Sequence, residues 1–282
     1  MKIAACVILY NPEDAVEKNI YSYIHHVEKV YVIDNSEHKN YASQFLSAYI
    51  SKVRFIHDGN NEGIAKRLNQ ACTLAVQDKF EYLLTMDQDS CFEQSTVERY
   101  LTCIGEYIEK ESTSMFGINH EQNLQKADCV FSKTSSLITS GSIINLAAYK
   151  DIGSFDENLF IDFVDTEYCF RSILKGYDVV LFPNIFMHHE IGKTTRHRSL
   201  KNLKSSKRSI HSAARLYYMI RNHFYLSKKY KDHFAQQLSI SKKDILNRIK
   251  NKLFYDSDRI QTIRYLLKAF NDYRNNRMGK LL

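Results

Sequence analysis

The sequence has no tryptophan and few of the residues that interrupt regular structure, with two prolines and nine glycines in 282 residues. This composition excludes a collagen-like chain and argues against a Gly/Pro-rich disordered one. No window of about 18 apolar residues occurs, so we expect no membrane-spanning helix. The first residues run directly into a strand-like segment, so we expect no signal peptide. With 44% hydrophobic residues, the chain can bury a sizeable core.

No two cysteines form a Cys-x-x-Cys pair, and the six are widely scattered. We therefore expect them to be reduced and mostly buried, as small apolar residues of a cytoplasmic protein. They are Cys6, Cys72, Cys91, Cys103, Cys129 and Cys169.

The net charge of +7 is unevenly distributed. Residues 193–282 hold 23 Lys and Arg against five Asp and no Glu, a net charge of +18. Residues 1–192 hold 16 Lys and Arg against 27 Asp and Glu, a net charge of −11. We expect the basic tail to be attracted to an anionic partner such as a membrane surface, a lipid phosphate or a nucleic acid.

Strand-like runs alternate with helical apolar stripes over the first 110 residues or so. The runs cover residues 3–9, 30–33, 53–57 and 82–86. This alternation predicts an α/β fold in which a mostly parallel sheet is flanked by helices. We expect Asn11, which precedes Pro12, to cap the first helix, and Ser95 to open a capping box with Glu98.

Residues 115–190 show a more mixed pattern. Strand-like runs occur at 136–145 and 178–182, and a predicted helix at 165–174 is closed by Gly176. Beyond about residue 205 the sequence is basic and helical in character.

Polar residues follow three of the predicted strands, as Tyr10-Asn11, Asp34-Asn35 and Asp87-Gln88-Asp89. Ligands of open parallel sheets bind at the carboxyl ends of strands, so these ends predict a site. Asp87 and Asp89 are two residues apart, so both carboxylates can converge on Mg²⁺ or Mn²⁺ that also binds phosphate oxygens. For Asp34 and Asn35, simple turn formation is an equally good interpretation.

Three further segments are weaker candidates. Asn61-Glu62-Gly63 opens a helix whose amides can face an anion, although a flexible turn is the commoner interpretation. Asp165 lies in an acidic, aromatic-rich cluster and is either a helix cap or a general base. His188-His189 follow a strand-like segment and are either metal ligands or ordinary structural residues.

Taken together, these segments resemble family 2 glycosyltransferases of the GT-A fold, and Asp-Gln-Asp-Ser at 87–90 resembles their rhamnosyltransferase branch. The similarity covers roughly residues 1–225, and Tyr218, Arg221 and Asn222 match a Tyr-x-x-Arg-Asn pattern of that branch. One departure is Gly153-Ser154, where the branch usually has Gly-Gly. The segments that carry the resemblance are 7–12, 32–36, 61–69, 84–90, 139–142, 153–157, 160–171 and 189–192.

The resemblance implies roles for particular residues. Tyr10 and Asp34 would hold the donor base, Asp87 the ribose or the metal shell, and Asp89 the metal. His189 would complete the metal site, with His188 as the alternative if the register shifts by one. Asp165 would be the catalytic base of an inverting, in-line displacement. The donor-binding set implied is Tyr10, Asn11, Asp34, Asn35, Asn61, Gly63, Lys66, Asp87, Gln88, Asp89 and Gly141.

The resemblance also implies a substrate class and a domain plan. The enzyme would be a metal-dependent hexosyltransferase that moves a sugar, with L-rhamnose from dTDP-rhamnose as leading candidate, to a glycan or polyprenyl-diphosphate-linked acceptor in bacterial surface polysaccharide synthesis. UDP-hexose and galactofuranose donors remain alternatives. We expect a GT-A catalytic domain over 1–205, with a nucleotide-sugar-binding half at 1–110 and an acceptor-binding half at 111–205. Residues 206–282 would form a basic helical region.

The basic tail either docks on an anionic membrane at the cytoplasmic face or packs as a solvated helical face on the catalytic domain. A nucleic-acid binder ranks low because it leaves the acidic strand ends unexplained. A nucleotidyltransferase would carry a Gly- and Lys/Arg-rich loop after the first strand, which is absent. A non-catalytic nucleotide- or membrane-binding module is the remaining rival, and a homo-oligomer is left open.

Overall fold

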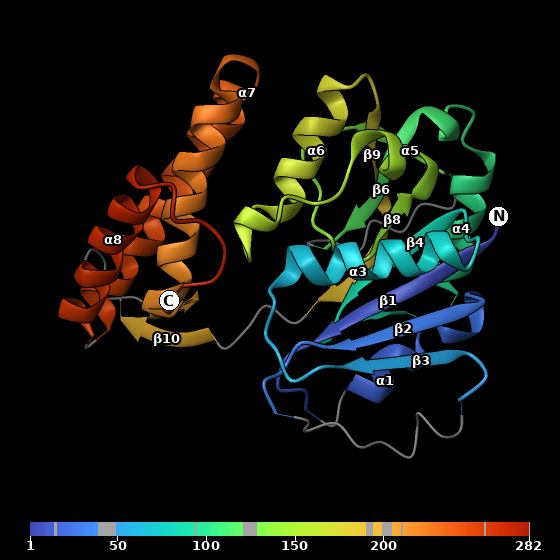
Figure 1. Ribbon diagram of the computed structural model, residues 1–282, viewed down its shortest axis with the longest axis horizontal. Coiled ribbons are helices and arrows are strands. Elements are labelled where there is room, and N and C mark those ends of the chain that lie inside the picture. The colour runs from blue at the N-terminus through green and yellow to red at the C-terminus, as the bar shows by residue number, and fades with distance from the viewer. Residues whose placement is uncertain are drawn as a thin grey trace. The chain divides into compact units, whose positions relative to one another are not determined.

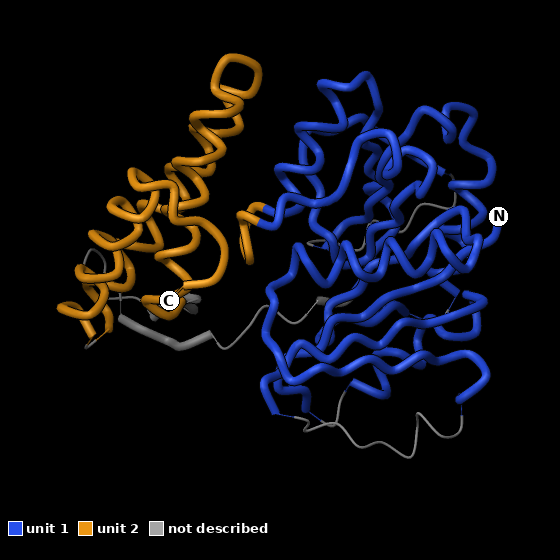
Figure 2. Tube along the Cα trace, in the orientation of Figure 1, with its two compact units in different colours: residues 1–157, 164–189 blue, residues 158–163, 190–282 orange. Residues whose placement is uncertain are grey.

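The structure is a computed structural model that describes residues 1–13, 16–38, 49–93, 95–120, 129–189, 194–198, 205–209, 211–256 and 258–281. The side chains of residues 188, 189, 194–198 and 205–209 lie outside this description. The chain divides into two compact units (Figure 2). The sheet unit comprises Met1–Glu157 and Val164–His189, and the helical unit comprises Asn158–Phe163 and Glu190–Leu282.

The first half of the sheet unit alternates strands and helices, as the sequence predicts (Figure 1). Its four strands pair in parallel, and all but β3 are rich in buried Val, Ile and Leu. The strands are β1 (Ile3–Leu9), β2 (Lys29–Asp34), β3 (Val53–His57) and β4 (Tyr82–Asp87). The helices are α1 (Val16–Tyr21), η1 (Ile24–His26), α3 (Ile64–Gln77) and α4 (Thr96–Glu106).

The second half of the sheet unit adds strands of both directions. The main sheet has the order β3-β2-β1-β4-β8-β6-β9-β5, with β7 paired to β9. β8 runs antiparallel to both β4 and β6, so the sheet is mixed at this point. The strands are β5 (Ser90–Phe92), β6 (Thr113–Asn119), β7 (Ser132–Lys133), β8 (Ser142–Asn145) and β9 (Asp178–His189). The helices are η2 (Lys110–Ser112), α5 (Leu146–Ile152), η3 (Glu157–Leu159) and α6 (Val164–Leu174).

Different helices cover the two faces of this sheet. Alternate residues of β1 point to opposite sides, and Val7 packs with Ile20 of α1 and Ile104 of α4 in one buried cluster. α3 lies across the other face of β1 and β4 and buries Ala71 and Cys72 there (Figure 1). The strand ends therefore emerge between two helical layers, which is the usual place for a ligand site in such a sheet.

The longer segment of the helical unit contains a two-stranded antiparallel ribbon, β10 (Thr194–Arg198) and β11 (Ser205–Ser209). Two helices follow, α7 (Ala213–Tyr255) and α8 (Arg259–Arg274). α7 is interrupted at Phe234, whose φ of −127° and ψ of 37° are non-helical. The chain folds back there, because His223 Nδ1 lies 3.2 Å from Ser241 Oγ.

Some predicted boundaries are wrong. Asn11 has a φ of 45° and does not cap a helix, since α1 begins at Val16. Ser95 precedes α4, but its φ is 71° and its side chain makes no capping hydrogen bond, so the expected capping box does not form. The predicted strand at 136–145 is a strand only at Ser142–Asn145. The helical region expected from about 205 begins with β11, and α7 starts at Ala213.

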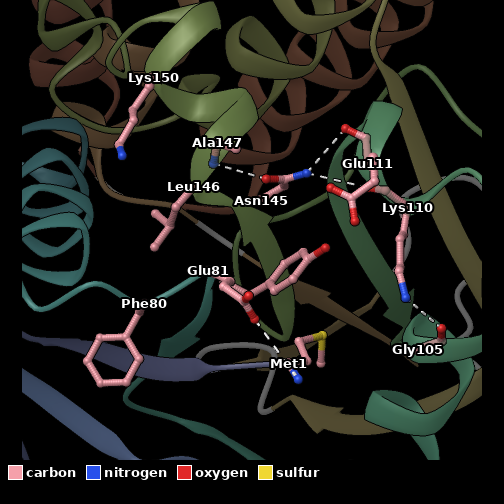
Figure 3. Close-up of a pocket in the computed structure, with 11 residues that line it drawn as sticks. Met1, Phe80, Glu81, Gly105, Lys110, Glu111, Asn145, Leu146, Ala147 and Lys150 are labelled. Carbon is pink, nitrogen blue, oxygen red and sulfur yellow. Dashed lines mark hydrogen bonds and ion pairs between the residues drawn. The ribbon is translucent and has the colours of Figure 1, made fainter.

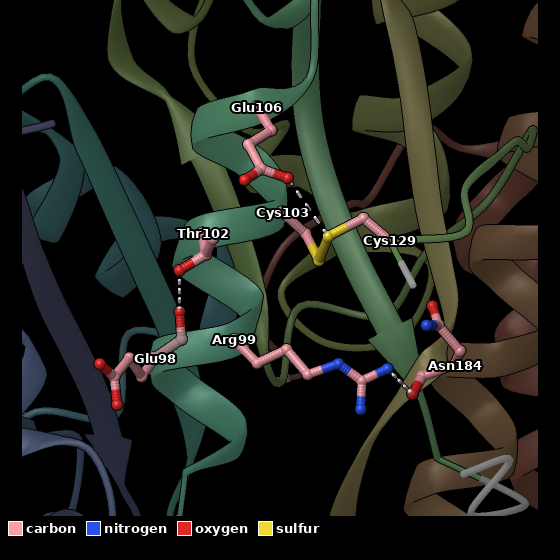
Figure 4. Close-up of a disulfide and its surroundings, with 7 residues drawn as sticks. All are labelled: Glu98, Arg99, Thr102, Cys103, Glu106, Cys129 and Asn184. Atoms are coloured by element: carbon pink, nitrogen blue, oxygen red, sulfur yellow. Dashed lines mark hydrogen bonds between the residues drawn. A yellow bond between two sulfur atoms is a disulfide. The ribbon is translucent and has the colours of Figure 1, made fainter. Parts of the chain in front are cut away.

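The expectation that all six cysteines are reduced is also wrong, because Cys103 and Cys129 form a disulfide (Figure 4). Cys103 lies on α4 and Cys129 is 26 residues further along the chain. The remaining four cysteines form no disulfide, and Cys6, Cys72 and Cys169 are buried as expected. Burial raises the pKa of the Cys6 thiol to about 12, with the Asp87 carboxylate adding to the shift.

Within the described ranges, no helix is both long enough and apolar enough to cross a membrane.

Candidate functional site

The register of the parallel strands aligns the predicted polar residues at one edge of the sheet. Leu9, the last residue of β1, pairs with Asp34 at the end of β2, and Asp34 pairs with His57 at the end of β3. On the other side of β1, Ile8 pairs with Asp87 at the end of β4. The segments that follow these strands therefore start from the same edge.

Gln88 connects the ends of β1 and β4 by side-chain hydrogen bonds. Its Oε1 accepts from the Tyr10 backbone N–H at 2.8 Å, and its Nε2 donates to the Tyr10 carbonyl at 3.1 Å. Its own carbonyl accepts from Asn19 Nδ2 of α1 at 2.7 Å. The Tyr10 side chain stays 46% exposed beside these hydrogen bonds. In this conformation Gln88 holds the acidic turn, Asp87-Gln88-Asp89, in place and leaves the Tyr10 ring available to a ligand.

Asp87 and Asp89 flank Gln88 in the tight turn between β4 and β5, and both are partly exposed. The backbone N–H of Asp87 donates to Ser140 Oγ at 3.1 Å, and Ser140 Oγ donates to Ser90 Oγ at 2.8 Å. Ser140 and Ser90 are buried. The turn is thus positioned by a buried pair of hydroxyls as well as by Gln88.

Gly141 supports the same turn from behind. Its N–H donates to the Thr85 carbonyl of β4 at 2.8 Å, and its φ is 73°. A Cβ at this position would lie 2.7 Å from Ile118 Cδ1 and 3.0 Å from Met187 Cε. Gly141 is buried, so its glycine is explained by packing and by the left-handed backbone.

Asp34 is completely buried at the end of β2. Its Oδ1 accepts from the Ser36 backbone N–H at 3.0 Å, and its Oδ2 lies 3.1 Å from His57 Nδ1. Ser36 Oγ in turn accepts from the Asn11 backbone N–H at 2.7 Å. Asp34 therefore connects the loops after β1, β2 and β3, and His57 is a member of the site that sequence reasoning missed.

Arg67 of α3 is the second missed residue, although it lies within the 61–69 segment that carried the family resemblance. Its guanidinium is buried and donates two hydrogen bonds, of 2.8 and 2.6 Å, to the two carboxylate oxygens of Asp58. It also donates to Asn35 Oδ1 at 3.0 Å and to the Asn60 carbonyl at 2.6 Å. The hydrogen bonds from Arg67 lower the pKa of Asp58 to about 2. A charge this well satisfied fixes the loop between β3 and α3.

The predicted residues Asn61 and Gly63 belong to this loop, Lys66 lies in the first turn of α3, and Asn35 reaches the loop from the end of β2. Asn35 Oδ1 accepts from the Glu62 N–H at 2.8 Å, and Asn35 Nδ2 donates to Asn61 Oδ1 at 3.0 Å. Gly63 precedes α3 with a φ of 81°. Lys66 is half exposed and pairs with Glu62 at 2.8 Å. The backbone N–H groups of the first turn of α3, which have no partner within the helix, thus lie between the hydrogen-bonded loop that precedes α3 and the exposed Lys66.

His189 approaches the acidic turn through its backbone. β5 pairs with β9 so that Ser90, which directly follows Asp89, is opposite His189, and Cys91 is opposite His188. Both histidine side chains lie outside the description. Among the described residues, no group of three or more His, Cys, Asp or Glu is arranged to hold a metal ion. What is described is an Asp87/Asp89 pair, and carboxylate oxygens are the ligands that Mg²⁺ and Mn²⁺ prefer.

The second acidic cluster separates into residues with different tasks. Asp165 lies in the first turn of α6, partly exposed, and its Oδ1 accepts from the Thr166 N–H at 2.8 Å. Glu167 is fully buried and pairs with Arg171 at 2.9 Å. Arg171 also donates to the carbonyls of Ile152, Gly153 and Ser154. Glu167 and Arg171 are therefore structural, whereas Asp165 is partly exposed.

Asn69 of α3 links the two halves of the sheet unit. Its Nδ2 donates to the Phe155 carbonyl at 3.0 Å and to Glu157 Oε1 at 2.9 Å, and its Oδ1 accepts from the Phe155 N–H at 2.8 Å. α3 thus carries Arg67, which orders the loop after β3, and Asn69, which orders the loop before η3. No role was predicted for either residue.

Two other cavities in the sheet unit are separate from the strand-end site. One of about 450 Å³ opens at the amino end of β4, where Glu81, Lys110, Glu111 and Lys150 line it (Figure 3). The other, of about 490 Å³, lies beside the Cys103–Cys129 disulfide. The first lies at the opposite end of β4 from Asp87, so its charges take no part in the acidic turn.

Comparison with known proteins decides the family. The sequence profile of glycosyl transferase family 2 matches residues 4–113, which span β1 to the start of β6. The dTDP-rhamnosyl transferase RfbF of Shigella flexneri is 31% identical over 260 residues, covering 84% of this chain and 83% of the relative. The chain belongs to glycosyl transferase family 2. The predicted membership of this family, with its rhamnosyltransferase-like character, is therefore confirmed.

Solved structures support the fold of this family 2 glycosyltransferase. TarS of S. aureus matches 98% of the chain with a TM-score of 0.54 at 16% identity. GalNAc-T7, solved with UDP, GalNAc and Mn²⁺, matches 98% of the chain with a TM-score of 0.61 at 12% identity. The chain spans 49% and 56% of the lengths of these two proteins. The predicted GT-A type α/β fold is confirmed, and at these identities the likeness shows the fold alone.

Proposed function

We propose that this glycosyltransferase transfers L-rhamnose from dTDP-rhamnose to a hydroxyl of a glycan or lipid-linked acceptor. The observation that carries the proposal is the aligned strand edge that ends in the braced Asp87-Gln88-Asp89 turn, in a chain similar to RfbF over most of its length. Tyr10 would stack on the donor base, and the exposure of its ring supports this role. Asp34 and Asn35 act behind it by ordering the loops that would surround the nucleotide.

The diphosphate of the donor would lie between the acidic turn and the start of α3. Lys66 and the first amides of α3 offer positive charge to the phosphates. Asp87 and Asp89 would hold Mg²⁺ or Mn²⁺, with His189 as the further ligand that its register beside Ser90 suggests. When bound, the metal would stabilise the negative charge that develops on the departing diphosphate. Asn11, Asn61, Gln88 and Gly141 would fix the surrounding loops rather than contact the donor.

Asp165 is proposed as the catalytic base. Its partly exposed carboxylate, held at the start of α6 by the Thr166 N–H, can accept a proton from the acceptor hydroxyl. Attack of that oxygen on the anomeric carbon would then displace the diphosphate with inversion. The proposed setting is surface polysaccharide synthesis, with an acceptor presented at an anionic membrane.

The test is a thermal-shift screen of nucleoside diphosphates and their sugars, with and without Mn²⁺. A ligand that binds only the folded protein raises its melting temperature. At a ligand concentration about a hundred times Kd, the free energy of unfolding increases by about 2.7 kcal/mol. We expect a metal-dependent shift that is largest with dTDP and dTDP-rhamnose. Asp89→Ala should abolish the shift, and Asp165→Asn should retain it while losing transfer of labelled rhamnose to a membrane fraction.

Glu98→Gln is the matched control, because Glu98 is an exposed acid on α4 of the same unit. It should behave as wild type in both assays. A melting shift seen only with UDP or its sugars would mean that the donor is not dTDP-rhamnose, although the proposed site would stand. A shift that is unchanged in Asp89→Ala would mean that the Asp87-Gln88-Asp89 turn does not bind the donor.

A further inference from the structure

α8 presents an apolar stripe to solvent. Ile260, Ile263, Leu267 and Phe270 follow one another at helical spacing, and they are 71%, 48%, 67% and 47% exposed. Residues at this spacing line one face of a helix. Single exposed apolar residues are ordinary, but a continuous stripe along a helix is a mark of an interaction surface.

The opposite face of α8 is already occupied by α7. Thr262, Ala269 and Asp272 are buried, and Tyr217 donates to Asp272 Oδ2 at 2.8 Å. The Phe270 ring packs partly on Phe224 of α7. The helix is therefore fixed by one face, and its exposed stripe is not needed to hold the helical unit together.

Cations border the stripe on both sides. Arg259, Arg264 and Lys268 lie along α8 next to the apolar positions, and Arg274 follows at its end with its guanidinium over the Phe270 ring. The acidic side chain of the helix, Asp272, points away from this face and is paired with Lys268. A stripe of Ile, Leu and Phe flanked by Lys and Arg has the composition of a helix that lies in the plane of a membrane interface.

We propose that the exposed face of α8 is a docking surface for an anionic phospholipid bilayer. The four apolar side chains insert at the boundary between headgroups and acyl chains, and Arg259 and Arg264 bind the lipid phosphates. This inference deepens the proposed function, on which it rests only for the acceptor that the membrane would carry.

Charge complementarity favours a bilayer over a second copy of the chain. Two α8 faces brought together would oppose Arg259 and Arg264 of each copy, because Asp272, the acid of the helix, points away from this face and pairs with Lys268, and like charges in an interface are repulsive. Anionic headgroups supply the opposite charge that Arg259 and Arg264 lack on this face.

The lysines of α7 provide an internal control. Lys228 and Lys231 are exposed, and Lys229 lies over the rings of Tyr225 and Tyr230. Among the described residues from 213 to 239, no large hydrophobic side chain is markedly exposed. This part of α7 has the charge of the α8 face without its apolar stripe.

The experiment is flotation of the full-length protein with vesicles of phosphatidylcholine alone or mixed with phosphatidylglycerol. Wild type should float with the mixed vesicles. I260S/L267S and R259Q/R264Q should each reduce the partition coefficient about tenfold or more, since each removes buried apolar area or two surface charges. K228Q/K231Q removes the same number of charges from α7 and should reduce it by no more than about threefold.

The α8 variants should keep the metal-dependent melting shift with the donor, which separates failure of docking from failure of the donor site. Wild type that does not float, or α8 variants that float like wild type, would overturn the proposal. If the α7 and α8 charge variants lose the same amount of vesicle binding and I260S/L267S binds like wild type, the binding is nonspecific charge attraction and the proposal is wrong. If I260S/L267S instead converts a dimer to a monomer by light scattering, the face belongs to a second copy.

Discussion

Arg67 in the sheet unit and Arg221 in the helical unit are both buried, but different groups receive their hydrogen bonds. Arg67 grips the Asp58 carboxylate with two bonds. Arg221 donates to the carbonyls of Gly279 and Asn158, to the side chain of Asn222 and to the Tyr217 hydroxyl. Within the described residues, a carboxylate reaches Arg221 only through Tyr217, which bonds Asp272.

The difference reflects what each arginine must hold. Asp58 remains 43% exposed at the rim of the strand-end site, so Arg67 orders a loop that a ligand can approach. Arg221 and Asn222 are fully buried and hold the segment 158–163, where Phe160, Asp162 and Phe163 all have positive φ values. Asn222 Nδ2 alone donates to the carbonyls of Leu159, Ile161 and Asp162. One arginine serves a site, and the other maintains a strained backbone.

The largest expected effect is on the helical unit. Arg221→Met should lower the free energy of unfolding by more than about 3 kcal/mol, because several buried acceptors lose their donor at once. Arg67→Met should cost about 2 kcal/mol, since water can reach the exposed part of Asp58. Urea unfolding gives the two values, and hydrogen exchange assigns each loss to a unit.

If Arg67→Met proves the more damaging of the two, or if Arg221→Met loosens only the sheet unit, the contrast between the two arginines fails. Arg248→Met is a suitable surface control, because Arg248 is partly exposed on α7 and pairs with Asp244. Its cost should stay within about 0.5 kcal/mol.

The disulfide gives the next effect, and it should separate the units more cleanly. Cys103 and Cys129 both belong to the sheet unit, and they close a loop of 26 residues. Loop closure of this length stabilises the fold by about 3 kcal/mol, so reduction should lower the melting temperature of the sheet unit by about 5–10 °C. Differential scanning calorimetry with and without a phosphine reductant measures the shift.

C103A/C129A should lose its sensitivity to the reductant, and Cys91→Ala should keep that of wild type, since Cys91 is a cysteine of the same unit that is not part of the disulfide. Hydrogen exchange in α7 and α8 should not respond to the reductant. A response there, or none in the sheet unit, would contradict this assignment of the disulfide to one unit.

The sequence was most informative where local signals decide structure. β1, β2, β3 and β4 were all predicted within one or two residues, because buried parallel strands are continuous apolar runs that end at polar residues. The same pattern located Asp34 and Asp87 at the carboxyl ends of their strands. Family resemblance then supplied possible roles that spacing alone could not.

The rest depended on contacts distant in sequence. His57 joins the site only because β3 pairs with β2, and Cys103 meets Cys129 without any characteristic spacing. Asn11 and Ser95 have the residue types of helix caps, yet both have positive φ values, outside the extended conformation typical of a cap. Asn222 shows the same limit, since nothing local indicates that its amide holds a segment 60 or more residues earlier.

The smallest effect is the pH dependence of the Arg67–Asp58 pair. The Arg67 hydrogen bonds lower the folded-state pKa of Asp58 to about 2, below the value of about 3.9 in an unfolded chain. The stabilisation is therefore complete above about pH 4 and is lost as the pH falls toward about 2. Because the Asp58 side chain is 43% exposed, we expect the pair to stabilise the fold by only about 1 kcal/mol after solvent screening.

Urea unfolding of wild type and Asp58→Asn at several pH values measures this stabilisation. The difference in free energy of unfolding between the two proteins should shrink by about 1 kcal/mol as the pH falls from about 4 to about 2. The difference between wild type and Arg221→Met should change less, because backbone carbonyls do not titrate. Equal changes in the two comparisons would show that the arginines do not differ in the way the structure indicates.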